Sequence, residues 1–219
     1  MAARSRYLNG ATGRVAGRNP GFRLRKVVPM EARAATLHEI RSALNAEHQH
    51  LWLLIASLRR ASVDERQSSL QRLLRYLAVH EAAEEVAIHN AWVTDSTRER
   101  LDEEREAAEI VERLARLGDD PAETGEAVPM GATPSDDDFL VALDQLERSL
   151  RDHAEAEENE ELPILAAELP KEQVGEMLRV VLMVRELAGD AASPIADGSF
   201  STMRLAAQRE FKAAISQLR

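Results

Sequence analysis

Apolar residues recur every three or four positions along most of the chain. In the first such segment, the apolar stripe runs from Ile40 through Leu44 to Leu58. This spacing matches the 3.6-residue period of an α-helix, so each segment should bury one face against its neighbours. The pattern predicts helices over about residues 33–60, 64–93, 97–117, 136–168, 171–188 and 201–218.

The segments between these helices set the expected architecture. Residues 118–138 are rich in Gly, Pro and Asp, which is typical of a long loop. Pro163 should bend the fourth helix or interrupt its hydrogen bonds, because proline has no N–H group. Four long amphipathic helices with a loop midway predict an all-α, up-down four-helix bundle within residues 33–168. Residues 169–219 should add one or two accessory C-terminal helices packed on the bundle, and residues 1–32 should form a basic, irregular tail.

Ionisable side chains interrupt the apolar stripe in each of the first four helices. In the second helix, His80 lies three residues after Leu77, and Glu84 follows one turn later. Burying such groups without partners would cost several kcal/mol each. A cation that neutralises them explains the pattern, as in bundle proteins that bind two metal ions. The six interrupting residues are His48, His80, Glu84, Glu104, His153 and Glu157.

The pattern His-x-x-x-Glu-Glu occurs twice, as HEAAEE at residues 80–85 and HAEAEE at residues 153–158. Side chains four residues apart project from the same helix face and can bind one metal centre. For each copy, the preceding helix carries one polar residue on its apolar stripe. This residue is His48 for the first copy and Glu104 for the second. Two facing helix pairs would therefore bring all six side chains together. The acids Asp152, Glu155 and Glu160 should instead lie on the solvated helix surface.

Composition and charge narrow the class of protein. The 219 residues include no cysteine, which excludes disulfides, thiolate ligands and cysteine catalysis. Residues 1–30 carry seven basic residues and no acid; since the whole chain has a net charge of −10, the rest carries −17. Such a body repels nucleic acid and attracts cations. With no apolar run long enough to cross a membrane and no signal-peptide core, we expect a cytoplasmic protein without a membrane partner. An organellar transit peptide is the alternative for the Arg-rich start.

The chain resembles the hemerythrin-like, or HHE cation-binding, family over about residues 35–168. NAEHQHLWLLIASL resembles the first helix of that family, LLRYLAVHEAAEEVAIHNAW the second, and LRDHAEAEENEELPIL the fourth, including its trailing Leu-Pro. The resemblance implies a non-haem centre of two iron ions, bridged by oxo or carboxylate groups, for which manganese or zinc can substitute. It also implies a small-molecule partner such as O2, H2O2 or NO.

The third helix departs from the family pattern. In DEEREAAEIVERL, Glu104 stands where the family places a histidine, and Ala108 follows one turn later. The histidine pair that oxygen-carrying relatives have on this helix is therefore absent. Replacing an imidazole by a hard carboxylate stabilises the ferric state and favours oxygen activation over reversible oxygen carriage.

Three classes of function follow. The first is a di-iron protein that reacts with O2, peroxide or nitrogen oxides, as an oxygenase, peroxidase or catalase-like oxidoreductase would. The second is a non-catalytic module that binds or senses O2, NO or iron, and the third is a metal-free helical scaffold with solvated acids. The repeat argues against the third class. No substrate motif identifies catalytic residues or an electron donor.

Several neighbours of the six residues are candidates for supporting roles. Glu81 is a possible extra ligand, because related HHE domains sometimes use that position. Tyr76 lies one turn before His80 and Trp52 one turn after His48, so both could line the metal pocket, with plain core packing as the alternative. Tyr76 could also donate a hydrogen bond to a ligand or bind iron itself. His50, about 200° round the helix from His48, should point away, and Glu85 and Glu158 should face solvent or contact a ligand.

Overall fold

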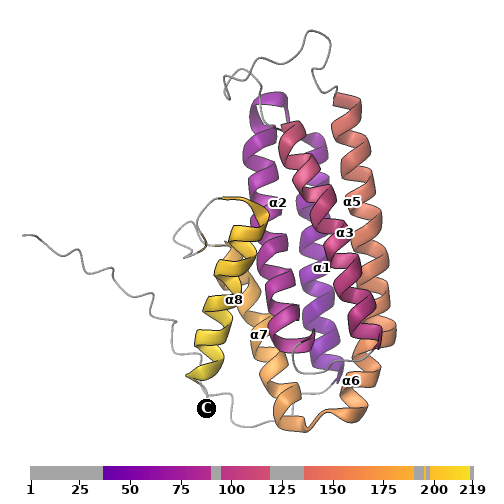
Figure 1. Cartoon of the computed structure of the whole chain (residues 1–219), viewed down its shortest axis with the longest axis vertical. Helices are drawn as coiled ribbons and strands as arrows, with labels where there is room; N and C mark the ends of the chain where they lie inside the picture. Colours follow the sequence, from indigo (N-terminus) through magenta and orange to yellow (C-terminus); the bar gives the residue numbers. More distant parts are fainter. Residues whose placement is uncertain (1–36, 90–94, 119–135, 190–194, 196–197, 218–219) are drawn as a thin grey trace, which may run out of the picture. The chain divides into compact units, whose positions relative to one another are not determined.

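The structure is a computed structural model, and it describes residues 37–89, 95–118, 136–189, 195 and 198–217. Within these residues all regular structure is helical and no strand is present (Figure 1). The predicted all-α class is therefore confirmed. The predicted N-terminal tail and most of the predicted long loop lie outside the described residues.

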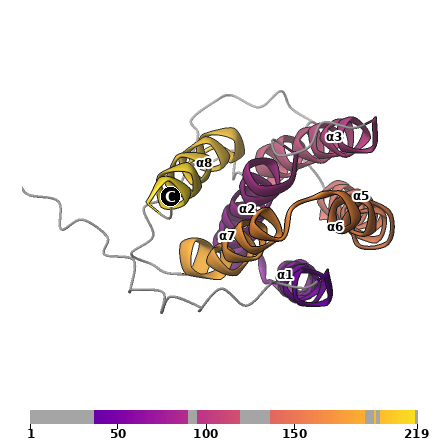
Figure 2. The ribbon, with the colours of Figure 1, turned by 90° about the horizontal axis from the view of Figure 1, so that it is seen from below.

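Four helices form the bundle that the apolar stripes predict. Each contacts two of the others in a ring, so that α1 and α3 both pack against α2 and α5 (Figure 2). Leu44, Leu77, Val111 and Leu146 fill the space between them and are almost completely buried. The bundle helices are α1 (Leu37–Arg60), α2 (Val63–Glu84), α3 (Asp95–Gly118) and α5 (Asp136–Ala156).

Local sequence signals fix where the helices begin. Ser62 caps α2, and the side chain of Glu65 reaches back to the Ser62 backbone, which is a capping box that satisfies free N–H groups of the first turn. Asp136 and Asp138 lie in the first turn of α5, where their charge is favourable beside the positive end of the helix dipole.

Two short π-helical segments interrupt the long helices. The first, η1 (Glu85–His89), follows α2 directly, and the second, η2 (Glu157–Glu161), joins α5 to α6 (Leu162–Glu168). The Leu162 N–H bonds the carbonyl of Glu157, five residues back, in place of the usual four. The apolar pattern predicts a helix over residues 64–93 without a break, and a helix over residues 136–168 that bends or is interrupted at Pro163. The structure moves this interruption to the turn before the proline, beside the second His-x-x-x-Glu-Glu copy.

Two further helices cover one side of the bundle. The first, α7 (Lys171–Gly189), packs against α1 and α2, and the second, α8 (Phe200–Ser216), packs mainly along α2 (Figure 2). Ser199 begins α8 by accepting the Thr202 N–H at 3.3 Å. The buried face of α8 consists of Phe200, Met203, Ala207, Phe211 and Ala214.

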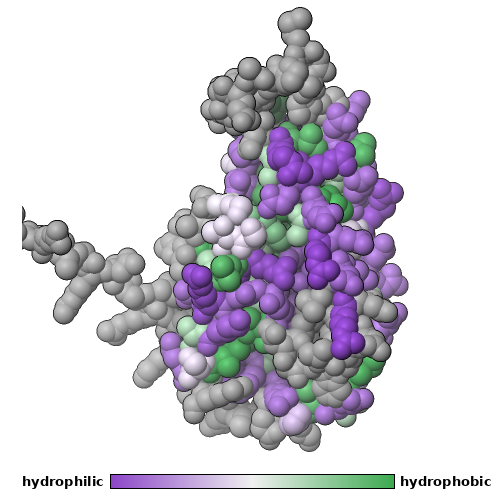
Figure 3. Space-filling model, in the orientation of Figure 1, coloured by the Kyte–Doolittle hydropathy of each residue, from purple (hydrophilic) through white to green (hydrophobic). Residues whose placement is uncertain are grey.

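The surface agrees with a bundle whose apolar faces are turned inward. The face drawn in Figure 3 is mostly hydrophilic, with hydrophobic side chains in small, separate patches. Leu53 and Leu182 are examples of large apolar residues that remain exposed singly. None of the helices in the described part of the chain is long and apolar enough to cross a membrane.

Replacing Phe211 by alanine should destabilise the whole bundle, because α8 folds against α2. Phe211 is fully buried, so its loss should lower the free energy of unfolding by about 3–5 kcal/mol. Leu205→Ala on the same helix is the matched control, since Leu205 is 49% exposed; it should cost about 0.5 kcal/mol or less. Urea unfolding followed by circular dichroism measures both. Equal midpoints would mean that α8 is not part of the cooperative unit.

Candidate metal centre

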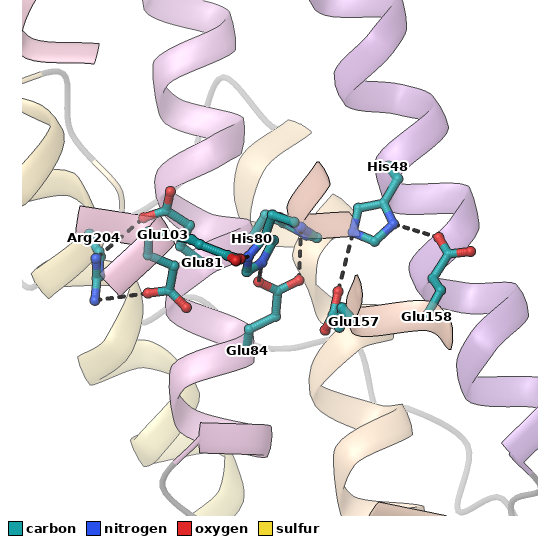
Figure 4. Close-up of polar contacts among 10 residues, drawn as sticks. His48, His80, Glu81, Glu84, Glu103, Glu157, Glu158 and Arg204 are labelled. Carbon is teal, nitrogen blue, oxygen red and sulfur yellow. Dashed lines mark hydrogen bonds and ion pairs between the residues drawn. The ribbon is translucent and has the colours of Figure 1, made fainter. Parts of the chain in front are cut away.

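All six stripe-interrupting residues are buried in the interior of the bundle. None of them is more than 8% exposed. They come from all four bundle helices and from the first residue of η2, and the four that Figure 4 labels lie in one row across the bundle. The residues are His48 on α1, His80 and Glu84 on α2, Glu104 on α3, His153 on α5 and Glu157 at the start of η2.

A first group able to hold a metal ion consists of His48, His80 and Glu84. One ligand atom from each lies within 4.8 Å of the others. His80 Nε2 is 2.8 Å from Glu84 Oε1, and the rings of His48 and His80 are nearly perpendicular, with centroids 5.1 Å apart. Two imidazole nitrogens and a carboxylate oxygen are donors that a divalent transition metal prefers.

A second group consists of Glu84, His153 and Glu157, so it shares Glu84 with the first. Glu84 Oε2 lies 3.6 Å from His153 Nε2, whereas its other oxygen faces His80 (Figure 4). A carboxylate whose two oxygens face different imidazoles can bridge two metal ions. Glu157 Oε2 lies 3.4 Å from His48 Nε2, which connects the groups a second time.

The buried oxygens of Glu157 test whether these residues fit a cation. Glu157 is completely buried, yet neither of its side-chain oxygens accepts a hydrogen bond from the described residues. A buried carboxylate in this state is costly unless a cation compensates it, and either the protonated imidazole of His48 at 3.4 Å or a metal ion in its place can do so. His48 Nε2 likewise lacks a hydrogen-bond partner among the described residues. Nitrogen and oxygen donors without a thiolate suit iron, manganese or zinc, so the donor set fits such an ion.

Protonation of the metal-free site follows from the same contacts. Burial alone would lower the pKa of His48, but the carboxylates of Glu157 and Glu158 beside its two ring nitrogens outweigh burial and raise this pKa to about 10. Burial would raise the pKa of Glu84, but His80 and His153 hold it well below its usual range. At neutral pH without metal, His48 therefore carries a proton that a metal ion must displace.

Two carboxylates outside the groups orient the histidine rings. Glu158 Oε1 lies 2.7 Å from His48 Nδ1, and Glu103 Oε2 lies 3.2 Å from His153 Nδ1. Each contact leaves Nε2 of the ring to face the centre, which is the usual role of such partners around metal sites. The sequence predicts that Glu158 either faces solvent or supports one of the six residues, and the structure shows it in contact with His48. Glu103 is missed, because it lies off the apolar stripe.

Glu104 lines the same cavity but belongs to neither group of three. Its Oε2 lies 3.3 Å from Arg204 Nη2, and Glu81 Oε2 lies 3.3 Å from Arg204 Nη1. Burial and the charge of Glu104 raise the pKa of Glu81 well above its usual range, against the opposing effect of Arg204. Arg204 comes from α8, and no sequence signal connects it to the site.

The aromatic neighbours lie around the centre in different ways. The Trp52 ring is stacked on His48, with centroids 6.4 Å apart, so it borders the first group. Tyr76 donates its hydroxyl proton to the buried carboxylate of Glu47 and contacts none of the six residues through that group. His50 points away from the centre, as expected, and its ring lies 4.4 Å from that of Tyr76.

A cavity of about 10 Å³ lies beside the two groups. A space of this size holds about one water molecule. Leu51, Leu77 and Leu150 supply apolar lining, and the remaining lining includes residues of both groups together with Glu81, Glu103 and Glu104. Without rearrangement, the cavity therefore admits only a very small molecule.

Comparison with known proteins gives one match. The family model of the Hemerythrin HHE cation binding domain matches residues 39–165, which is more than half of the chain. The matched segment contains both His-x-x-x-Glu-Glu copies and both π-helical segments, whereas α7 and α8 lie outside it. No curated protein and no solved structure gives a significant match.

Metal binding should strengthen with rising pH and release protons. Because the pKa of His48 is raised to about 10 in the metal-free protein, the affinity of the first group for Zn²⁺ should rise about tenfold per pH unit between about pH 7 and pH 8. An ordinary histidine, with a pKa near 6.5, would give almost no rise over that range. Calorimetric titrations in buffers of different ionisation enthalpy count the released protons. A flat affinity over this range would contradict the protonated His48.

Proposed function

Because the chain belongs to the hemerythrin HHE cation-binding family, we propose that it holds two iron ions at the buried centre and reacts there with O2, peroxide or a nitrogen oxide. The observation that carries this proposal is the position of Glu84. Its two oxygens face the imidazoles of His80 and His153, so one carboxylate serves two groups. A single ion would leave one of these groups without a cation.

The proposed ligands divide into two overlapping sets. His48, His80 and Glu84 would hold the first ion, and Glu84, His153 and Glu157 the second. When bound, a pair of iron ions supplies Lewis acidity and electrons for reaction with a small oxidant. Manganese or zinc suits the same donors, because ligand type alone selects weakly among these metals.

The surroundings favour a reactive centre over a carrier. Besides the two carboxylates in the groups, Glu81 and Glu104 are buried beside the same cavity. Anionic surroundings stabilise the ferric state of iron and oppose the return to the ferrous state that reversible oxygen binding needs. Apolar walls from Leu51, Leu77 and Leu150 limit the access of water to this space.

A second candidate function is the non-catalytic binding or sensing of O2, NO or iron. The small size of the cavity favours it, since about 10 Å³ leaves no room for an organic substrate beside the centre. The two candidates share the same metal centre and differ in what happens to the small molecule.

The metal content of single variants tests the shared ligand. The wild-type chain should bind about two iron ions, and His80→Gln and His153→Gln should each keep about one. Glu84→Gln should keep fewer than one, because it removes a ligand from both groups. His50→Gln is the matched control: it removes a histidine near the centre that belongs to neither group, and it should keep both ions. Anaerobic reconstitution followed by elemental analysis measures all five proteins. Loss of only one ion in Glu84→Gln would contradict the bridging role.

Exposure of the ferrous protein to O2 and to peroxide separates the two functions. A reactive centre should consume either oxidant over repeated cycles when a chemical reductant is supplied. A carrier or sensor should instead take up O2 or NO in stoichiometric amount and release it unchanged when the gas is removed. Oxygen-electrode and peroxide-consumption assays make the distinction, with His50→Gln as a positive control and Glu84→Gln as the negative one.

A further inference from the structure

We propose that Arg204 is a positioning residue that keeps Glu81 and Glu104 out of the metal coordination and so determines how many carboxylates the centre has. This inference rests on the proposed metal centre. It concerns a residue of α8, which lies outside the segment that matches the family. The consequence is a metal centre whose donor set is controlled by the C-terminal extension of the chain.

The Arg204 guanidinium contacts three carboxylates at once. Its Nη1 lies 3.3 Å from Glu81 Oε2, and its Nη2 lies 3.3 Å from Glu104 Oε2 and 2.8 Å from Glu85 Oε2. Figure 4 shows Arg204 at one end of the row of polar side chains and Glu158 at the other, with His80 and Glu84 between them. The planar fork of an arginine can hold several carboxylate oxygens in fixed directions, which a lysine cannot do.

Packing of α8 fixes the guanidinium in this place. Met203 and Ala207 on either side of it in the sequence are completely buried. One turn further along, Gln208 donates its side-chain amide to Glu85, the same carboxylate that Arg204 contacts. The arginine therefore reaches the edge of the metal cavity from a helix that is anchored on α2.

Glu81 and Glu104 are close enough to the centre to change it. Both line the cavity together with His80, Glu84 and His153. Glu81 follows His80 directly in the sequence, and its Oε1 has no hydrogen-bond partner among the described residues. A buried carboxylate beside a metal ion is available to coordinate that ion when no other group holds it. Arg204 is placed to be this other cation.

The position of Arg204 predicts the sign of its effect. If Arg204 were only a structural brace, its removal would loosen the site and weaken metal binding. If it restrains two carboxylates, its removal gives the centre an additional anionic donor and takes away a nearby positive charge. Metal ions should then bind more tightly, and the ferric state should gain relative to the ferrous state, which lowers the reduction potential.

Arg204→Gln in the full-length chain, titrated with Co²⁺, tests the sign directly. The variant should bind Co²⁺ on the order of tenfold more tightly than wild type, since a unit charge has been removed close to the centre. The visible absorption of bound Co²⁺ should become weaker, as it does when the coordination number rises. Unchanged or weaker binding, with an unchanged spectrum, would overturn the proposal.

Double variants and a matched control identify the route of the effect. If the effect acts through the restrained carboxylates, Arg204→Gln combined with Glu104→Gln or with Glu81→Gln should return the affinity and spectrum towards wild type in at least one case. If neither combination does, the proposal is wrong. Arg185→Gln is the control, because it removes an accessory-helix arginine from another buried glutamate, Glu47, that does not line the cavity. It should leave the Co²⁺ spectrum unchanged.

Two further measurements keep the result interpretable. If Arg204→Gln fails to fold, as judged by circular dichroism, Arg204→Lys replaces it, because lysine keeps the charge but not the planar fork. Its affinity for Co²⁺ should then rise, but by less than is expected for Arg204→Gln. An unchanged affinity would overturn the proposal. Wild type is titrated first. If it binds neither Co²⁺ nor iron, the metal centre itself is refuted and this inference falls with it. If it binds two ions and the Arg204 variants behave as wild type, only this inference fails.

Discussion

The buried carboxylate of Glu84, shared between the imidazoles of His80 and His153, is the constraint on which the rest of the structure depends. Its two oxygens lie 2.8 Å and 3.6 Å from Nε2 of the two rings, so α2 and α5 must keep a fixed register. The apolar layers on both sides of the centre, such as Leu77 and Leu146, hold that register and also keep water away from the charges. Burying the acids is costly, and a cation held by these residues would offset this cost with few additional contacts.

The π-helical segments also affect where the side chains of the centre lie. A π turn takes one residue more than an α turn, so the residues after it are displaced relative to an uninterrupted helix. At η2 the adjacent Glu157 and Glu158 both reach His48, one at Nε2 and the other at Nδ1. The wider turn thus lets one helix supply both a ligand and the group that orients another ligand. Pro163, which cannot donate a backbone hydrogen bond, makes the departure from regular α-helix less costly at this place.

Periodicity predicts the helices and the inward direction of the six polar stripe residues, because both depend only on neighbours within one helix. Contacts between helices that are far apart in the sequence carry no such signal. Arg204 and Glu81 are 123 residues apart, and nothing in the spacing of either indicates the other. The π turns are also missed. The second of them, Glu157–Glu161, contains no apolar residue from which a change of period could be read. For Glu104 the pattern predicts burial, which the structure has, but it gives no sign of the Arg204 guanidinium beside the Glu104 carboxylate.

The accessory helices complete the charge balance of the bundle. The segment that matches the family contains more buried glutamates than the two metal groups use. Two of the additional acids are paired with arginines from outside that segment, Glu47 with Arg185 of α7 and Glu104 with Arg204 of α8. Glu84 and Glu157 belong to the groups that could hold a metal ion, whereas these two additional acids are neutralised by guanidinium groups. On electrostatic grounds the bundle alone is therefore incomplete. Through Arg204, α8 contacts residues that line the cavity of the centre, whereas α7 neutralises a buried acid away from that cavity.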